Sequence, residues 1–164
     1  MAKYSRDLDD ALVAKVKNLS AQYGLKDAGI RVEAIRLTKG KTYGEVKQAN
    51  ELTQLFTGED NIVAVALYEE VMEQFDDAAQ DMLIKNLLEQ IVAQEDKEGG
   101  YKVKIEKPQL NVGVGTYQFY GKEIMDVLEA VILTLDQMAE QEKAAKEAAK
   151  EAKKQNKKNK KDNY

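Results

Sequence analysis

The sequence has neither cysteine nor histidine among its 164 residues. Without cysteine the chain has no disulfides, no thiolate metal ligands and no thiol nucleophile. Without histidine it lacks the commonest general base and the commonest zinc ligand. These absences exclude much of enzyme chemistry, so we expect a protein that is not an enzyme and that uses no metal and no cofactor.

Long apolar runs are missing as well. No stretch approaches the roughly 20 consecutive apolar residues that a membrane-spanning helix needs. The N-terminal sequence MAKYSRDLDD also lacks the apolar core of a secretory signal peptide. We therefore expect a protein of the cytoplasm that has no membrane partner.

The residues that are present suit one folded domain followed by a charged end. Hydrophobic residues make up 43% of the sequence and charged residues 33%, which allows a core beneath a well-solvated surface. Domains typically hold about 100–150 residues. We predict a single globular domain over residues 1–138, a charged helical extension over 139–152 and a disordered lysine-rich tail over 153–164.

Three segments have the patterns of β-strands. Residues 30–37 alternate between apolar and polar side chains, with a phase change near Ala34 that indicates a bulge. Residues 61–67, NIVAVAL, form a short continuous apolar run, which is typical of a strand buried on both faces. Residues 101–105 alternate again as a half-exposed strand, and the glycines at 113 and 115 indicate a turn or a glycine-relaxed strand.

Two helices are predicted among these strands. Ser5 is a candidate N-cap for the first, and Gly24 is a suitable stop because glycine readily takes the left-handed conformation. Residues 45–57 are predicted to form a second, short helix that ends at Gly58.

The central helix is predicted to be the most buried. It opens at Ala78, capped by Asp76 or Asp77, and continues to the break at residues 97–100. Its apolar band is wider than one stripe because it includes Met82, Leu83, Leu87 and Ile91.

The last helix carries an apolar seam whose members recur at steps of four and three: Ile124, Leu128, Val131, Leu135 and Met138. We expect Ile132 and Leu133 to thicken this docking face. Beyond Met138 only alanines continue the pattern, so residues 139–152 read as a charged single helix projecting from the body, or alternatively as a coiled-coil partner site. Together the elements predict an α+β fold, with a small mixed sheet of three to four strands packed by the central helix and the long C-terminal helix.

The charges are unevenly distributed along the chain. The side chains of residues 153–164, KKQNKKNKKDNY, sum to +5, so the other 152 residues carry −9 of the total of −4. The tail cannot bury enough apolar surface to offset the entropy of ordering it. It is either a solubilising appendage or a contact for nucleic-acid phosphates through Lys153, Lys154, Lys157, Lys158, Lys160 and Lys161. Three aromatic residues that might stack on bases are interpreted instead as packing residues: Tyr117, Phe119 and Tyr120.

The central helix includes IKNLLEQI, residues 84–91, and is followed by QEDKEGGYKVKIEKPQL. In spacing and element order, residues 61–110 resemble a family of phage-encoded metallopeptidases with a zincin-like fold, whose helix carries Ile-x-His-Glu-Leu-x-His-Ile. At the two ligand positions of that pattern stand Asn86 and Gln90, and at the base position stands Leu87. Neutral amides are poor zinc donors and leucine accepts no proton, so the resemblance implies a degenerate, inactive form. The alternative is an ordinary amphipathic core helix.

These patterns lead to two hypotheses about function. The first is a non-catalytic, phage-type protein that binds another protein of the phage or its host, through a cleft or edge of the zincin-like scaffold or through the projecting helix. The second is a nucleic-acid-associated accessory protein that acts through the lysine tail. If the chain is phage-encoded, its compartment is the cytoplasm of the host cell.

Overall fold

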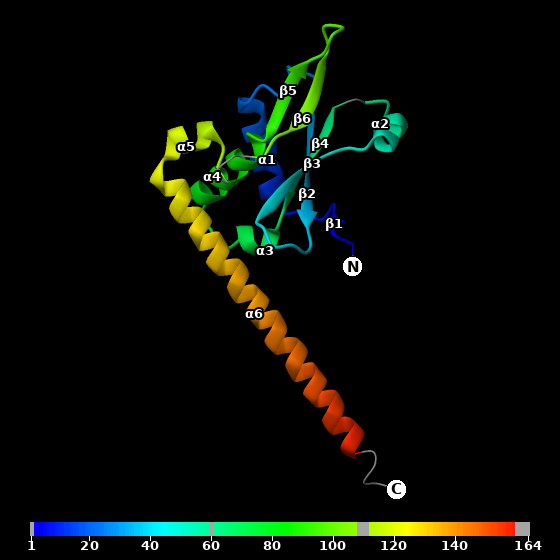
Figure 1. Ribbon diagram of the computed structural model, residues 1–164, viewed down its shortest axis with the longest axis vertical. Coiled ribbons are helices and arrows are strands. Elements are labelled where there is room, and N and C mark those ends of the chain that lie inside the picture. The colour runs from blue at the N-terminus through cyan, green and yellow to red at the C-terminus, as the bar shows by residue number, and fades with distance from the viewer. Residues whose placement is uncertain (1, 60, 108–111, 160–164) are drawn as a thin grey trace.

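A four-stranded mixed sheet lies at the centre of the computed structural model, which describes residues 2–59, 61–107 and 112–159 (Figure 1). The strand order is β1-β2-β4-β3, and a separate two-stranded sheet pairs β5 with β6. The strands are β1 Tyr4–Ser5, β2 Arg31–Leu37, β3 Gly44–Gln48, β4 Ile62–Leu67, β5 Ile91–Glu95 and β6 Tyr101–Ile105. The helices are α1 Asp10–Gln22, α2 Glu51–Thr57, α3 Glu69–Met72, α4 Asp77–Leu88, α5 Val114–Tyr120 and α6 Lys122–Asn159.

The arrangement confirms the predicted α+β class, with a mixed sheet, a buried helix and a long C-terminal helix. None of the helices in the described ranges combines the length and apolar character that a membrane span requires.

Strand β4 is buried on both faces, as its apolar run predicts. Val63, Val65 and Leu67 are fully buried and belong to the main core with side chains of α1 and α4, while Ala66 is fully buried on the opposite face. β4 pairs in parallel with β2 and antiparallel with β3. The central position of β4 therefore fixes both of its neighbours.

The N-terminal segment differs from the prediction at its cap. Asp9 caps α1, because its carboxylate accepts hydrogen bonds from the backbone N–H groups of Ala11 and Leu12. Ser5, the predicted cap, lies instead in β1 and hydrogen-bonds Asp7. Gly24 follows the helix with φ of 64°, which confirms the predicted stop.

Two errors concern the sheet. β2 keeps an unbroken register with β4 from the pair Arg31–Ile62 to the pair Arg36–Leu67, so the bulge predicted near Ala34 is wrong. Residues 45–48 belong to strand β3 rather than to a helix, because Val46 pairs with Val65 at the sheet edge. The predicted helix is confined to α2.

Two more segments change class in the middle of the chain. Asp76 caps α4, as one of the two predicted aspartates, but the helix ends at Leu88 and residues 91–95 form β5. The helix does not continue because residues 91–95 pair with β6 instead, and this pairing also buries Ile91 against the core. The glycine-containing stretch predicted as a turn or strand forms the short helix α5.

Helix α6 docks through the predicted seam and then leaves the body. Ile124 and Val131 are buried, and Leu128, Leu135 and Met138 are partly buried against the core. Ile132 and Leu133 are 59% and 63% exposed, so the prediction that they help to dock the helix is wrong. They follow Val131 around the helix, and their side chains face away from the body.

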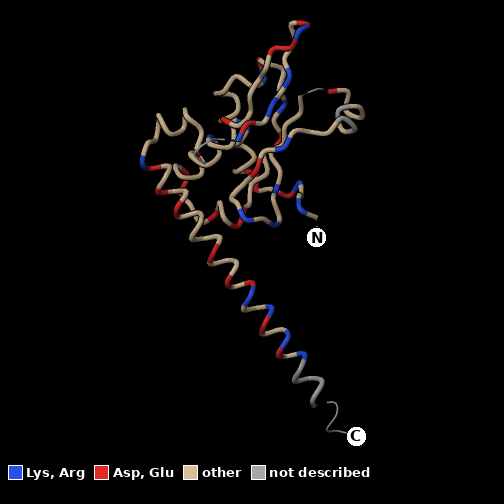
Figure 2. The backbone as a smooth tube through the Cα atoms, viewed as in Figure 1, with Lys and Arg blue, Asp and Glu red and all other residues tan. Residues whose placement is uncertain are grey.

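The projecting part of α6 includes the residues predicted to form a charged helical extension: all residues from 139 to 152 are exposed, and acidic and basic residues alternate along it (Figures 1 and 2). The helix continues to Asn159, so residues 153–159, which are predicted to belong to a disordered tail, are helical in this structure. Residues 160–164, with Lys160 and Lys161, lie outside the described part of the chain.

A matched pair of substitutions tests how α6 docks. We expect Ile124→Ala to lower the free energy of unfolding by about 2–5 kcal/mol, because it leaves a cavity at a fully buried position. Ile132→Ala removes the same atoms from an exposed position and should change stability by less than about 0.5 kcal/mol. Chemical denaturation measures both, and equal losses would show that the helix docks differently.

Candidate functional site

Of the three positions that the metallopeptidase pattern highlights, Asn86 and Leu87 lie in the last turn of α4, and Gln90 lies just beyond it. Asn86 is 2% exposed; its Nδ2 donates to the Tyr43 hydroxyl at 2.7 Å, and its Oδ1 accepts from the backbone N–H of Gly113 at 2.8 Å. The side chain thus joins α4 to the loop before β3 and to the segment before α5. A buried amide that is hydrogen-bonded at both ends holds the fold together.

The side chains at the other two positions are not arranged as metal ligands either. Leu87 is buried in the main core and packs so closely on Gly44 that a Cβ there would lie 2.7 Å from its Cδ1. Gln90 lies beyond the helix, in the turn that leads into β5, where its backbone carbonyl accepts from Glu106. Asn86 and Gln90 therefore do not share one helical face, as paired ligands would. Within the described ranges no cluster of three or more acidic residues is arranged to hold a metal.

Burial changes the acidity of the tyrosine that meets Asn86. The loss of hydration raises the pKa of Tyr43 to about 12, against a smaller opposing effect of the bond from Asn86. The neutral hydroxyl is thus retained across the physiological range, and the Asn86 bond to it persists.

A different site lies at β2, where the sheet is incomplete. β1 is only two residues long and covers β2 only at Arg36 and Leu37. Along residues 31–35, no described strand pairs with the side of β2 that faces away from β4. We call this side the open edge.

The register determines which backbone groups the open edge offers. Arg31 N–H donates toward β4, to the Asn61 carbonyl at 3.1 Å, and Thr38 N–H donates to the other side, to the Lys3 carbonyl at 2.9 Å. Because successive residues of a strand direct their backbone groups to alternate sides, Val32 and Ala34 direct theirs to the open edge. Two N–H and two C=O groups are therefore available for pairing with an added strand.

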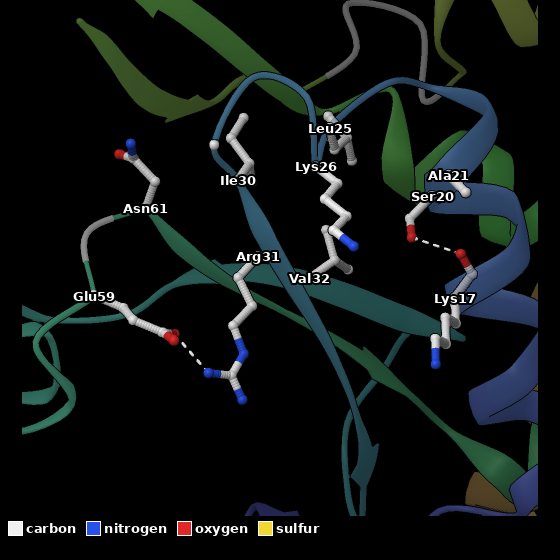
Figure 3. A pocket seen from close by; sticks show the side chains of 11 residues that line it. Lys17, Ser20, Ala21, Leu25, Lys26, Ile30, Arg31, Val32, Glu59 and Asn61 are labelled. Carbon is white, nitrogen blue, oxygen red and sulfur yellow. Dashed lines mark hydrogen bonds and ion pairs between the residues drawn. The ribbon is translucent and has the colours of Figure 1, made fainter.

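Beside the open edge, between the end of α1 and the start of β2, lies a pocket of about 740 Å³, which we call the edge groove (Figure 3). Its floor is apolar and includes Leu25, Ile30 and Val32. Figure 3 shows Lys17 and Ser20 on the α1 side of the groove, across from Arg31 and Glu59.

The positively charged side chains of the edge groove differ in whether they form ion pairs. Arg31 forms ion pairs with Glu33 and Glu59, both at 2.5 Å. Lys17 and Lys26 form no ion pair with any described residue. Two available positive charges therefore border an apolar groove on a body that is acidic overall.

The remaining sequence-predicted contacts lie far along α6 or on α5. Lys153 is exposed, and Lys154, Lys157 and Lys158 fall within the helical stretch that ends at Asn159. Tyr117 and Phe119 were expected to pack, yet they are 54% and 79% exposed.

The sequence hypothesis names a cleft or edge of the scaffold in general terms, but it does not locate the open edge or the edge groove. A two-residue strand such as β1 leaves no periodic signal, so the extent to which it covers β2 cannot be read from the sequence. Comparisons with known proteins add no assignment: no family model, no curated protein and no solved structure matches the chain.

The first prediction for this region concerns metal. We expect the purified protein to contain no stoichiometric zinc and to cleave no peptides, because amide and leucine side chains occupy the positions where ligands and base would stand. Elemental analysis provides the measurement. About one zinc per chain that survives dialysis against a weak chelator would contradict the expectation.

The second concerns the buried tyrosine. Because the folded-state pKa of Tyr43 lies above its ordinary value of 10.0, its contribution to stability is complete below pH 10 and is lost as the pH rises toward 12. Between pH 9 and pH 11.5 the wild type should lose about 2 kcal/mol more unfolding free energy than Tyr43→Phe. Denaturation curves at the two pH values measure the difference. Equal losses in both proteins would mean that Tyr43 is not held neutral by burial.

Proposed function

We propose that the protein is a non-catalytic binding module that takes up an extended segment of another protein alongside β2. The pairing capacity of Val32 and Ala34 at the open edge is the observation that carries this proposal. An extended peptide that adds to a sheet edge gains affinity from main-chain hydrogen bonds and specificity from pockets for its alternate side chains.

The edge groove provides such a pocket. Val32 belongs both to the open edge and to the groove, so a strand added beside it would place side chains over the apolar floor. Lys17 and Lys26 favour acidic side chains in the same segment. We therefore infer a partner segment in which apolar residues alternate with aspartate or glutamate.

Charge argues against two other occupants. The chain's own tail carries +5 over residues 153–164 and would be repelled by Lys17 and Lys26. A second copy of β2 would bring a second Arg31 and the same two lysines to the interface. An acidic segment of a different protein, from a phage or its host if the chain is phage-encoded, relieves this repulsion.

We propose a non-catalytic role because the α4 side chains at the positions of the metallopeptidase pattern are occupied by contacts within the fold. Asn86 is engaged with Tyr43 and Gly113, and Leu87 is in the core, so neither can also act on a substrate.

A displayed library of random ten-residue peptides tests strand addition. We expect selected peptides to alternate apolar and acidic residues and to bind Ala34→Pro at least about tenfold more weakly than the wild type. Proline removes an outward N–H that the ladder with β4 does not use, so the fold should remain. Ala34→Ser, which keeps the N–H, serves as the matched control and should bind as the wild type does.

A companion substitution checks the direction of the backbone groups. Glu33→Pro removes an N–H that faces β4 and should lower the unfolding free energy by about 1–3 kcal/mol, whereas Ala34→Pro should lower it less. Peptides that bind Ala34→Pro with unchanged affinity would contradict strand addition at this edge.

The selected peptides also distinguish strand addition from the nucleic-acid hypothesis. A chain ending at residue 152 should bind the selected peptides unchanged, because α6 leads away from the sheet through residues 153–159 (Figure 1). If the library yields no binder, and the full chain instead retains labelled oligonucleotides in a salt-sensitive way that the shortened chain loses, the lysine tail is the functional element.

A further inference from the structure

A second, smaller pocket lies where the end of α1, the last turn of α4 and α5 meet. Its volume is about 250 Å³, and we call it the polar pocket. Unlike the edge groove, it is lined by charged and hydroxyl-bearing side chains, among them Lys85, Glu89, Thr116 and Tyr120. It plays no part in strand addition at β2.

Thr116 gives the first indication that a ligand belongs here. It is 2% exposed, and its Oγ1 forms no hydrogen bond of normal geometry with a described residue; its one polar neighbour is the Tyr23 hydroxyl, whose pKa it lowers only slightly against the larger effect of burial. A buried hydroxyl without a partner destabilises a fold, so native proteins rarely retain one without a reason. Since Thr116 lines the pocket, a bound molecule is a candidate for the missing partner.

Two opposite charges give the second indication. Lys85 and Glu89 are four residues apart around the end of α4, a spacing at which such side chains commonly pair. No ion pair joins them among the described residues. Lys85 Nζ instead donates to the Tyr120 hydroxyl at 2.7 Å and lies over the rings of Phe119 and Tyr120, at 5.6 and 5.2 Å from their centroids.

The Glu89 carboxylate is held on the other side by close backbone contacts. A Cβ at Gly113 would lie 1.7 Å from Glu89 Oε2, and one at Gly115 would lie 2.8 Å from Oε1, so only glycine leaves room for it. Its one hydrogen bond from a described side chain is long, from the Tyr23 hydroxyl at 3.5 Å. The carboxylate therefore keeps acceptor capacity for a ligand.

We propose that the polar pocket binds a free α-amino acid. The ligand carboxylate would accept hydrogen bonds from the Lys85 ammonium and from the hydroxyls of Tyr120 and Thr116. The ligand ammonium would donate to Glu89, and the ligand side chain would pack on the ring of Phe119.

The volume of the pocket and the two opposite charges that line it support this class of ligand. Its volume lies below the roughly 300–1,000 Å³ typical of drug-sized ligands, which suits a small metabolite. A simple anion would leave Glu89 unmatched, and a simple amine would leave Lys85 unmatched. A molecule with an ammonium and a carboxylate on one carbon satisfies both charges.

Titration calorimetry with the full chain tests the proposal against the twenty free L-amino acids. We expect at least one to bind with a dissociation constant below about 1 mM. For leucine as an example, the matched analogues are isoamylamine, which lacks the carboxylate, and 4-methylvaleric acid, which lacks the amine. Each analogue should bind at least tenfold more weakly than the amino acid. No binding by any amino acid at 10 mM, or equal binding by the analogues, would overturn the proposal.

Three variants of the full chain locate the site. Lys85→Met, Glu89→Gln and Thr116→Val each remove one polar contact at nearly constant volume and should weaken binding at least tenfold. Thr116→Val should also raise the midpoint temperature of unfolding in the absence of ligand, because it removes an unpartnered buried hydroxyl. This readout requires no ligand and remains informative if Glu89→Gln lowers the stability of the fold.

A control pair lies on the neighbouring helix. Lys122→Met and Glu123→Gln change the same charges outside the pocket and should leave binding unchanged. Loss of binding in the control pair, or normal binding in Thr116→Val, would place the amino acid elsewhere on the molecule.

Discussion

The pairing of β4 with a strand on each side is the constraint on which the other elements depend. Its buried apolar run forces β2 into a parallel register from Arg31–Ile62 to Arg36–Leu67 and places β3 antiparallel on the far side. That register determines which side of β2 each backbone group faces. β1 covers only the last part of β2, so the backbone groups of Val32 and Ala34, which the register directs away from β4, face the open edge.

The end of α4 illustrates how a position can serve the fold instead of chemistry. Asn86 is buried and joins three segments that are distant in the sequence, through the hydroxyl of Tyr43 and the backbone of Gly113. An imidazole placed there to hold a metal would have to give up these contacts. Lys85, the residue before Asn86, and Glu89, three residues after it, border the polar pocket, so the charged side chains lie beside Asn86 rather than at the ligand positions of the metallopeptidase pattern.

The sequence predicts long, strongly patterned elements well and short or tertiary-dependent ones poorly. The continuous apolar run of β4, the alternation of β6 and the seam of α6 each extend over enough residues to be recognised. Residues 45–48 and 91–95 carry ambiguous patterns, and they become strands because partners distant in the sequence pair with them. Neither the open edge nor the polar pocket has a local signal, since each depends on which segments the fold brings together or leaves apart.

The orientation of the β2 backbone is the central claim, and amide hydrogen exchange measured residue by residue in the free protein tests it most directly. The account predicts that the amides of Val32 and Ala34 exchange at least about tenfold faster than that of Glu33, which lies between them and faces β4. Protection of all three amides to the same extent would contradict it, because the edge of β2 would then be covered.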